Sequence, residues 1–201
     1  MAPGRNESPD AHEERGEANG VSHPQESNSL GLNSPPMQNG GGTSLRVRDI
    51  FDSLAVIGDL DRTDAVLVLS PIVPPVSWAP NSDPFECFCR ALENRHSHIR
   101  HTTYDNNSGI LDTHRQLIRL SRVIILILAD SEADGRTPQI NVLHAHMTVA
   151  TAGDDKRVII VVADSSEESW QRLVDFPTVL QATDYSQASL ERTVSAIFRE
   201  F

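Results

Sequence analysis

The segment Leu120–Ala129 is a nearly continuous apolar run that reads Leu-Ser-Arg-Val-Ile-Ile-Leu-Ile-Leu-Ala. A helix that spans a bilayer needs roughly 20 apolar residues, so this run is too short to cross a membrane. It is rich in β-branched residues and has no polar alternation, which is typical of a strand buried on both faces. Val158–Ala163 and Ala65–Ser70 have the same character. Together the three runs predict the centre of a parallel sheet that helices cover above and below.

The remaining patterns predict strands and helices that alternate along the chain. Five strands are expected, at Asp64–Ser70, His98–Tyr104, Leu120–Ala129, Lys156–Ala163 and Thr178–Asp184. Helices are expected at Pro84–Arg95, Ile110–Leu120, Pro138–Ala152, Glu167–Val174 and Ser186–Phe198. We therefore predict the α/β class, as a flavodoxin-like doubly wound parallel sheet with the strand order 2-1-3-4-5.

The first part of the chain differs in composition from the rest. Residues 1–44 are dominated by Pro, Gly, Ser, Asn and Glu, and we predict a disordered acidic tail. Residues 45–60 carry apolar side chains at helical spacing, which predicts an amphipathic helix or linker. Such a helix could dock onto the following domain or bind a partner. Residues 61–201 form the predicted α/β domain.

The charge and cysteine content bound the function classes. The formal net charge is −11, from 17 Lys and Arg against 28 Asp and Glu, so nucleic acid and anionic membrane surfaces are poor partners. The chain has two cysteines, which fits a reducing compartment, and its N-terminus lacks the apolar core of a signal peptide. We expect a cytoplasmic protein without membrane insertion.

Sequence motifs for catalysis or cofactor binding are absent. Neither phosphate-binding glycine pattern follows a strand, and Ser70 and Ser121 have no recognisable triad. Asp130 ends a strand as in phospho-receiver domains, but acidic residues after the first strand and a lysine after the fifth are missing. We interpret the histidines as surface residues rather than metal ligands; they include His96, His98, His101, His144 and His146. The prediction is no catalytic residue, no metal and no cofactor.

Several fragments resemble the Toll/interleukin-1 receptor (TIR) domain family as a divergent member. Asp64–Ser70 is similar to the first family box, and Tyr104–Ile110 to the second, with Ser108 where a proline is usual. Ser121-Arg122 resembles the start of the family's third strand. Ala196-Ile197-Phe198-Arg199 occupies the place of the third box, without its tryptophan.

The resemblance implies a cytosolic protein-interaction module, an adaptor or regulator of innate-immune signalling through TIR–TIR association. Its partners would be TIR domains of receptors or adaptors, with self-association as a further option. The implied partner-binding loop consists of Asp105, Asn106, Asn107, Ser108, Gly109, Ile110 and Leu111. In this loop Ile110 could form an apolar tip, or could begin the next helix and be buried.

Two alternatives remain open at the level of sequence. Some members of the family cleave NAD with a glutamate early in the helix after the third strand. The matching helix here begins Thr137-Pro-Gln-Ile without that glutamate, and Glu132 precedes it. A flavodoxin-like enzyme such as a TIR-type NAD hydrolase is therefore the alternative function. A third hypothesis is a scaffold in which residues 1–42 are the functional part.

Overall fold

The computed structural model describes residues 45–73, 83–129 and 141–200. The chain divides into two units at Gly40, and all described residues belong to the second unit. The predicted tail at 1–44, the predicted Pro138 helix start and the strand-end residue Asp130 lie outside the described residues.

A six-stranded mixed sheet forms the centre of this unit, in the order β1-β6-β5-β4-β2-β3. The strands are β1 (Arg46–Asp49), β2 (Val66–Pro71), β3 (Ile99–Tyr104), β4 (Val123–Leu128), β5 (Arg157–Ala163) and β6 (Thr178–Ala182). Strands β2 to β6 are parallel and follow the predicted order, whereas β1 is antiparallel to β6. The prediction of five strands is therefore wrong by one edge strand.

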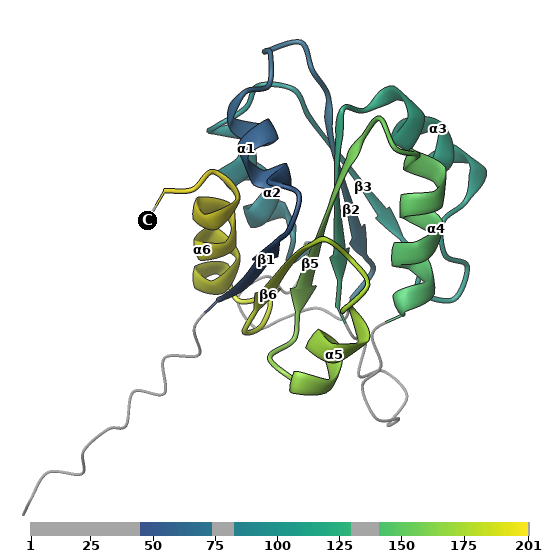
Figure 1. Cartoon of the computed structure of the whole chain (residues 1–201), viewed down its shortest axis with the longest axis vertical. Coiled ribbons are helices and arrows are strands. Elements are labelled where there is room, and N and C mark those ends of the chain that lie inside the picture. Colours follow the sequence, from purple (N-terminus) through teal and green to yellow (C-terminus); the bar gives the residue numbers. More distant parts are fainter. Residues whose placement is uncertain (1–44, 74–82, 130–140, 201) are drawn as a thin grey trace, which may run out of the picture. The chain divides into compact units, whose positions relative to one another are not determined.

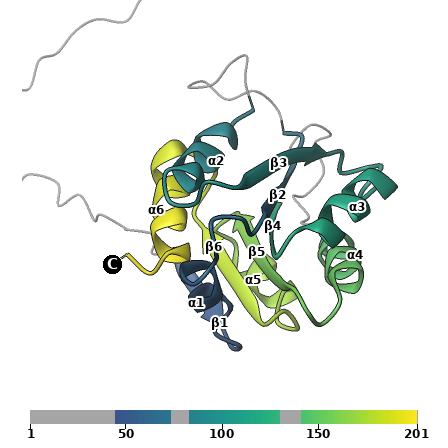
Figure 2. The same ribbon diagram turned by 90° about the horizontal axis from the view of Figure 1, so that it is seen from above.

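Helices alternate with the parallel strands and cover both faces of the sheet (Figures 1 and 2). They are α1 (Ser53–Gly58), α2 (Glu86–Glu93), α3 (Asp112–Leu120), α4 (Val142–Ala152), α5 (Glu167–Arg172) and α6 (Gln187–Ile197). Helices α1, α2 and α6 lie on one face, and α3 and α4 on the other (Figure 2). Within the described ranges, no helix combines the length and the apolarity that crossing a membrane requires.

The central strands are buried on both faces, as their continuous apolar sequences predict. In β4, Val123, Ile125 and Ile127 pack under α1, α2 and α6, and the residues between them pack under α3 and α4. Every residue of β2 and β4 is buried. Because alternate side chains point to opposite faces, one apolar run supplies both halves of the core.

The prediction of one helix across residues 45–60 is wrong in its first part. Residues Arg46–Asp49 form strand β1, which pairs with β6 through Val47 and Leu180, and only Ser53–Gly58 is helical. Asp49 ends the strand and accepts the N–H groups of Ser53 and Leu54 at 2.7 and 3.0 Å, which starts the helix. The helix docks on the sheet as expected, through Leu54 and Ile57.

Candidate functional site

The loop predicted to bind partners follows β3 and is held by its own first residue. The Asp105 carboxylate accepts the N–H of Asn107 at 3.1 Å, and the N–H and hydroxyl of Ser108 at 3.1 and 2.7 Å. The hydroxyl of Ser108, together with these backbone N–H groups, lowers the pKa of Asp105. The N–H of Gly109 donates to the Asp105 carbonyl oxygen at 2.7 Å. These bonds fix the turn and leave Asn107 and Ser108 exposed.

The second half of the loop turns into the core. Gly109 is buried with φ +67, and a Cβ at this position would lie 3.0 Å from Nε2 of His144. Ile110 is 2% exposed, whereas Leu111 is 50% exposed. The idea of Ile110 as an apolar tip is therefore wrong, and its alternative, burial at the start of a helix, is confirmed.

His114 joins the loop to the edge strand. Its Nδ1 accepts the Leu111 N–H at 3.0 Å, so its Nε2 carries a proton and donates to the Thr103 carbonyl oxygen at 3.2 Å. The ring thus occupies the third helical position and caps the helix start, as a glutamate does in a capping box. The spacing of three residues between Leu111 and His114 was the signal in the sequence that could have revealed this bond.

His144 supports the loop from α4. Its ring is 3% exposed, meets the Tyr104 ring edge-on at 5.0 Å, and accepts an N–H of Asn141 at Nε2, 3.0 Å away. Burial lowers the pKa of His144. His96 is also buried and bonds the Asp64 carbonyl oxygen at 2.7 Å. The interpretation as surface histidines is wrong for His96 and His144, since neither ring lies at the surface.

A serine near the carboxyl end of β2, a histidine from the middle of β3 and an aspartate before α2 lie close together. Oγ of Ser70 lies 2.7 Å from Nε2 of His101, and Oδ2 of Asp83 lies 3.4 Å from the same nitrogen. In a hydrolytic triad the carboxylate contacts the other ring nitrogen, which leaves Nε2 free to take the serine proton. Ser70 is also fully buried. The cluster therefore lacks the geometry of a nucleophile and its base, although the sequence had not indicated that these side chains meet.

Other potential sites are limited in the described part of the chain. Ser121 directly follows α3 and is 1% exposed. Its hydroxyl donates to the Leu117 carbonyl oxygen at 2.9 Å, so the side chain stabilises the end of this helix. No group of three or more His, Cys, Asp or Glu side chains in these ranges could hold a metal ion.

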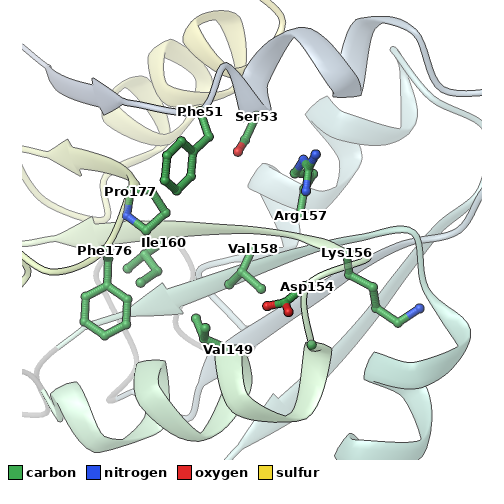
Figure 3. A pocket seen from close by; sticks show the side chains of 11 residues that line it. Phe51, Ser53, Val149, Asp154, Lys156, Arg157, Val158, Ile160, Phe176 and Pro177 are labelled. Carbon is green, nitrogen blue, oxygen red and sulfur yellow. The ribbon is translucent and has the colours of Figure 1, made fainter.

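A pocket of about 520 Å³ opens at the amino end of β5 (Figure 3). The predicted loop, in contrast, follows the carboxyl end of β3, which is parallel to β5 in the sheet. Its apolar walls include Phe51, Val149, Val158, Ile160 and Phe176. Asp154, Lys156 and Arg157 line the other end (Figure 3). No sequence pattern pointed to this pocket, because its walls come from three distant segments.

Comparisons with known proteins identify similar folds and no family. No protein-family model and no curated protein matches the sequence. One similar solved structure is a fungal multi-domain GH3 β-N-acetylglucosaminidase with a GCN5-related glucosamine N-acetyltransferase region. Its TM-score is 0.57 at 20% identity, over 79% of this chain and 17% of that one. Another is a glycoside hydrolase family 3 β-N-acetylglucosaminidase from Paenibacillus sp. str. FPU-7. Its TM-score is 0.54 at 13% identity, over 88% of this chain and 34% of that one. The chain thus spans 17% and 34% of the length of these proteins, and the likeness shows the fold alone.

Proposed function

We propose that this chain is a protein-association domain that binds its partner through the loop Asp105–Leu111. The observation that carries the proposal is the fixed turn at Asp105–Ser108, which presents Asn107 and Ser108 to solvent beside exposed Leu111. A loop that is already ordered loses little conformational entropy on binding. One apolar side chain flanked by polar groups is a suitable small contact surface.

TIR–TIR association is the form of this function that the sequence resemblance supports. The chain would then be a cytoplasmic adaptor or regulator in Toll/interleukin-1 type signalling, and its partners would be TIR domains of receptors or adaptors. We class the fold as flavodoxin-like and doubly wound, because the five parallel strands follow the order 2-1-3-4-5 under two helical layers.

A second candidate function is favoured by the two structural neighbours with TM-scores of 0.57 and 0.54. Both are multi-domain or larger β-N-acetylglucosaminidases, of which this chain matches 17% and 34%. In this candidate the chain is the α/β domain of a glycosidase-type assembly and associates with a catalytic domain. Its function would again be association rather than catalysis.

Co-precipitation of the full chain against two sets of immobilised domains tests both candidates. One set holds TIR domains, and the other holds catalytic domains of family 3 β-N-acetylglucosaminidases. Selective capture by the first set supports the signalling role, and selective capture by the second supports the glycosidase role. A folded chain that neither set captures contradicts both.

Two matched variants test the loop itself. Leu111 directly precedes α3 and Leu120 is its last residue; they are 50% and 68% exposed, so replacing either with Asp should leave the core intact. We expect Leu111→Asp to abolish capture and Leu120→Asp to preserve it. If both variants are captured like the parent chain, the loop is not the binding surface. Incubation with NAD and chromatography of the products tests the alternative enzyme, and nicotinamide release would contradict a purely associative role.

A further inference from the structure

The pocket at the amino end of β5 exists because β5 begins several residues before its pairing with β6 begins. Strand β5 pairs with β4 from Arg157 onward, but its pairing with β6 begins only at Ile160 with Val179. The first residues of β5 therefore have a strand neighbour on one side only. Phe176 and Pro177, just before β6, and Phe51, just before α1, surround the open side (Figure 3).

The apolar part of the pocket has a buried floor and an exposed rim. Ile160 and Phe176 are 1% and 4% exposed, whereas Val149 and Phe51 on the rim are 38% and 69% exposed. A volume of about 520 Å³ lies within the range of roughly 300–1,000 Å³ that is typical of small-molecule sites. An apolar body can therefore leave water here and contact both floor and rim.

Arg157 is a cation that lines the pocket from the α1 side of β5, whereas Val158 and Ile160 point to the α4 side (Figure 3). Its Nε is enclosed and has no hydrogen-bond partner among the residues that the structure describes. Across the described ranges, its guanidinium forms neither a hydrogen bond nor an ion pair with another side chain. A partly desolvated guanidinium binds a carboxylate well, because the two carboxylate oxygens can accept two parallel N–H hydrogen bonds from it.

Asp154 and Lys156 are the other two charged residues that line this end of the pocket. Asp154 is exposed and carries a negative charge, and Lys156 carries a positive one. The Lys156 ammonium points away from the apolar walls and lies 3.6 Å from Asp155 (Figure 3). Asp155 therefore balances Lys156, and the four charged residues from 154 to 157 sum to zero. Among the two cations at this end, Arg157 is the one that forms no ion pair within the described residues.

We propose that this pocket binds a small apolar carboxylate, with the acid group on Arg157 and the apolar body between Phe51, Val149, Ile160 and Phe176. The site is independent of the association loop, because the loop follows the carboxyl end of β3 and the pocket lies at the amino end of β5. It does not rest on the proposed function.

Titration of the full ¹⁵N-labelled chain with two matched probes tests the proposal by NMR. The probes are 1-naphthaleneacetate and 1-naphthaleneacetamide, which share the apolar body and differ in charge. We expect the carboxylate to bind with a dissociation constant of about 1 mM or tighter. Its shift changes should centre on Phe51, Val149 and Arg157, and the amide should bind roughly tenfold more weakly.

Three variants assign the binding to the named residues. Arg157→Gln should weaken the carboxylate roughly tenfold and leave the amide unchanged, because only the charged contact is lost. Val149→Glu places a carboxylate on the rim and should weaken both probes. Leu143→Glu is the control, since Leu143 is 61% exposed on the same helix and outside the pocket.

Three results would overturn the proposal. These are equal affinity for the two probes, shift changes centred away from the pocket, and unchanged carboxylate binding in the folded Arg157→Gln variant. Absence of binding by the parent chain up to the solubility limit of the probes would overturn it as well. If Arg157→Gln fails to fold, Val149→Glu against Leu143→Glu decides the location, and the comparison of the two probes decides the charge preference.

Discussion

The guanidinium carbon of Arg48 lies 4.5 Å from the centre of the Trp170 ring, which joins the first strand to α5 across 122 residues of sequence. The same guanidinium donates to the Leu173 carbonyl oxygen at 2.7 Å. Arg46 lies 5.1 Å from the ring as well and forms an ion pair with Glu167 at 2.5 Å. The antiparallel strand that the sequence did not predict is thus tied to α5 by side chains as well as to β6 by backbone pairing.

Replacing Arg48 with Met tests this link. We expect the free energy of unfolding to fall by about 1–2 kcal/mol, because the cation–π contact and the bond to Leu173 are lost together. A double-mutant cycle with Trp170→Leu in urea denaturation should give a coupling of about 0.5–1 kcal/mol. Arg119→Met is the control, since Arg119 is exposed on α3, and its effect should stay within about 0.5 kcal/mol. Zero coupling would mean that the two side chains act independently.

Gly109→Ala should destabilise the chain by about 1–2 kcal/mol. A non-glycine residue at φ +67 is strained, and the new Cβ would also lie 3.0 Å from Nε2 of His144. Gly58→Ala is the matched control, because a Cβ there meets nothing within 4 Å. That change should be neutral or stabilising by up to about 1 kcal/mol. Thermal or urea denaturation measures both, and equal effects at the two glycines would rule out a special conformation at Gly109.

Stability should fall as the pH is lowered through the range in which histidine titrates. Burial lowers the pKa of His144 below its ordinary value, although the nearby Asp105 carboxylate opposes this shift. Between the lowered pKa and about 6.5, the unfolded chain therefore binds more protons than the folded chain. The free energy of unfolding should thus decrease as the pH falls from about 7 through this window, and level off below the folded pKa.

Urea denaturation at several pH values checks this prediction. His144→Gln should show a smaller pH dependence than the parent chain. His146→Gln is the control, because His146 lies on the same helix with an exposed ring. A pKa of His144 at or above 6.5, followed by NMR of the imidazole ring, would refute the expected sign.

Tyr104→Phe should cost about 1–2 kcal/mol of stability. The Tyr104 hydroxyl donates to the Ile127 carbonyl oxygen at 2.7 Å, and the ring is 1% exposed. The pairing between β2 and β4 ends at Leu69 with Leu126. The Ile127 carbonyl oxygen is one residue beyond this pairing, and the Tyr104 hydroxyl provides its donor. Removal of the hydroxyl leaves that buried acceptor without its donor. Burial also raises the pKa of Tyr104, so a spectrophotometric titration should show delayed ionisation of this phenol in the folded chain.

Most of the sheet could be predicted from local sequence, because buried strands and amphipathic helices have different periodicities. The apolar run at Val123–Leu128 and its counterparts in β2 and β5 became central strands, and the helices between them formed within a few residues of their predicted bounds. The strand Arg46–Asp49 was missed because Val47, Ile50 and Phe51 are spaced as on a helix. Pairing with β6, 129 residues or more away, decided its conformation.

The candidate sites show the same division. The turn at Asp105–Ser108 follows from short-range hydrogen bonds between residues two and three positions apart, which the sequence contains in full. The burial of Ile110, the contact of His144 with Gly109 and the meeting of Ser70 with His101 depend on how distant segments pack. The pocket beside Arg157 depends on the stagger between β5 and β6.

The sequence by itself determined the α/β alternation and which strands are buried on both faces, because hydrophobic periodicity sets which faces must be buried. The strand order followed from the doubly wound fold type that this alternation predicts. Only the tertiary structure decided the sixth strand, the inward turn of Ile110 and the position of Arg157 at an apolar pocket. These features arise from strand register and from contacts between residues that are far apart in the chain, and no local pattern encodes such distances.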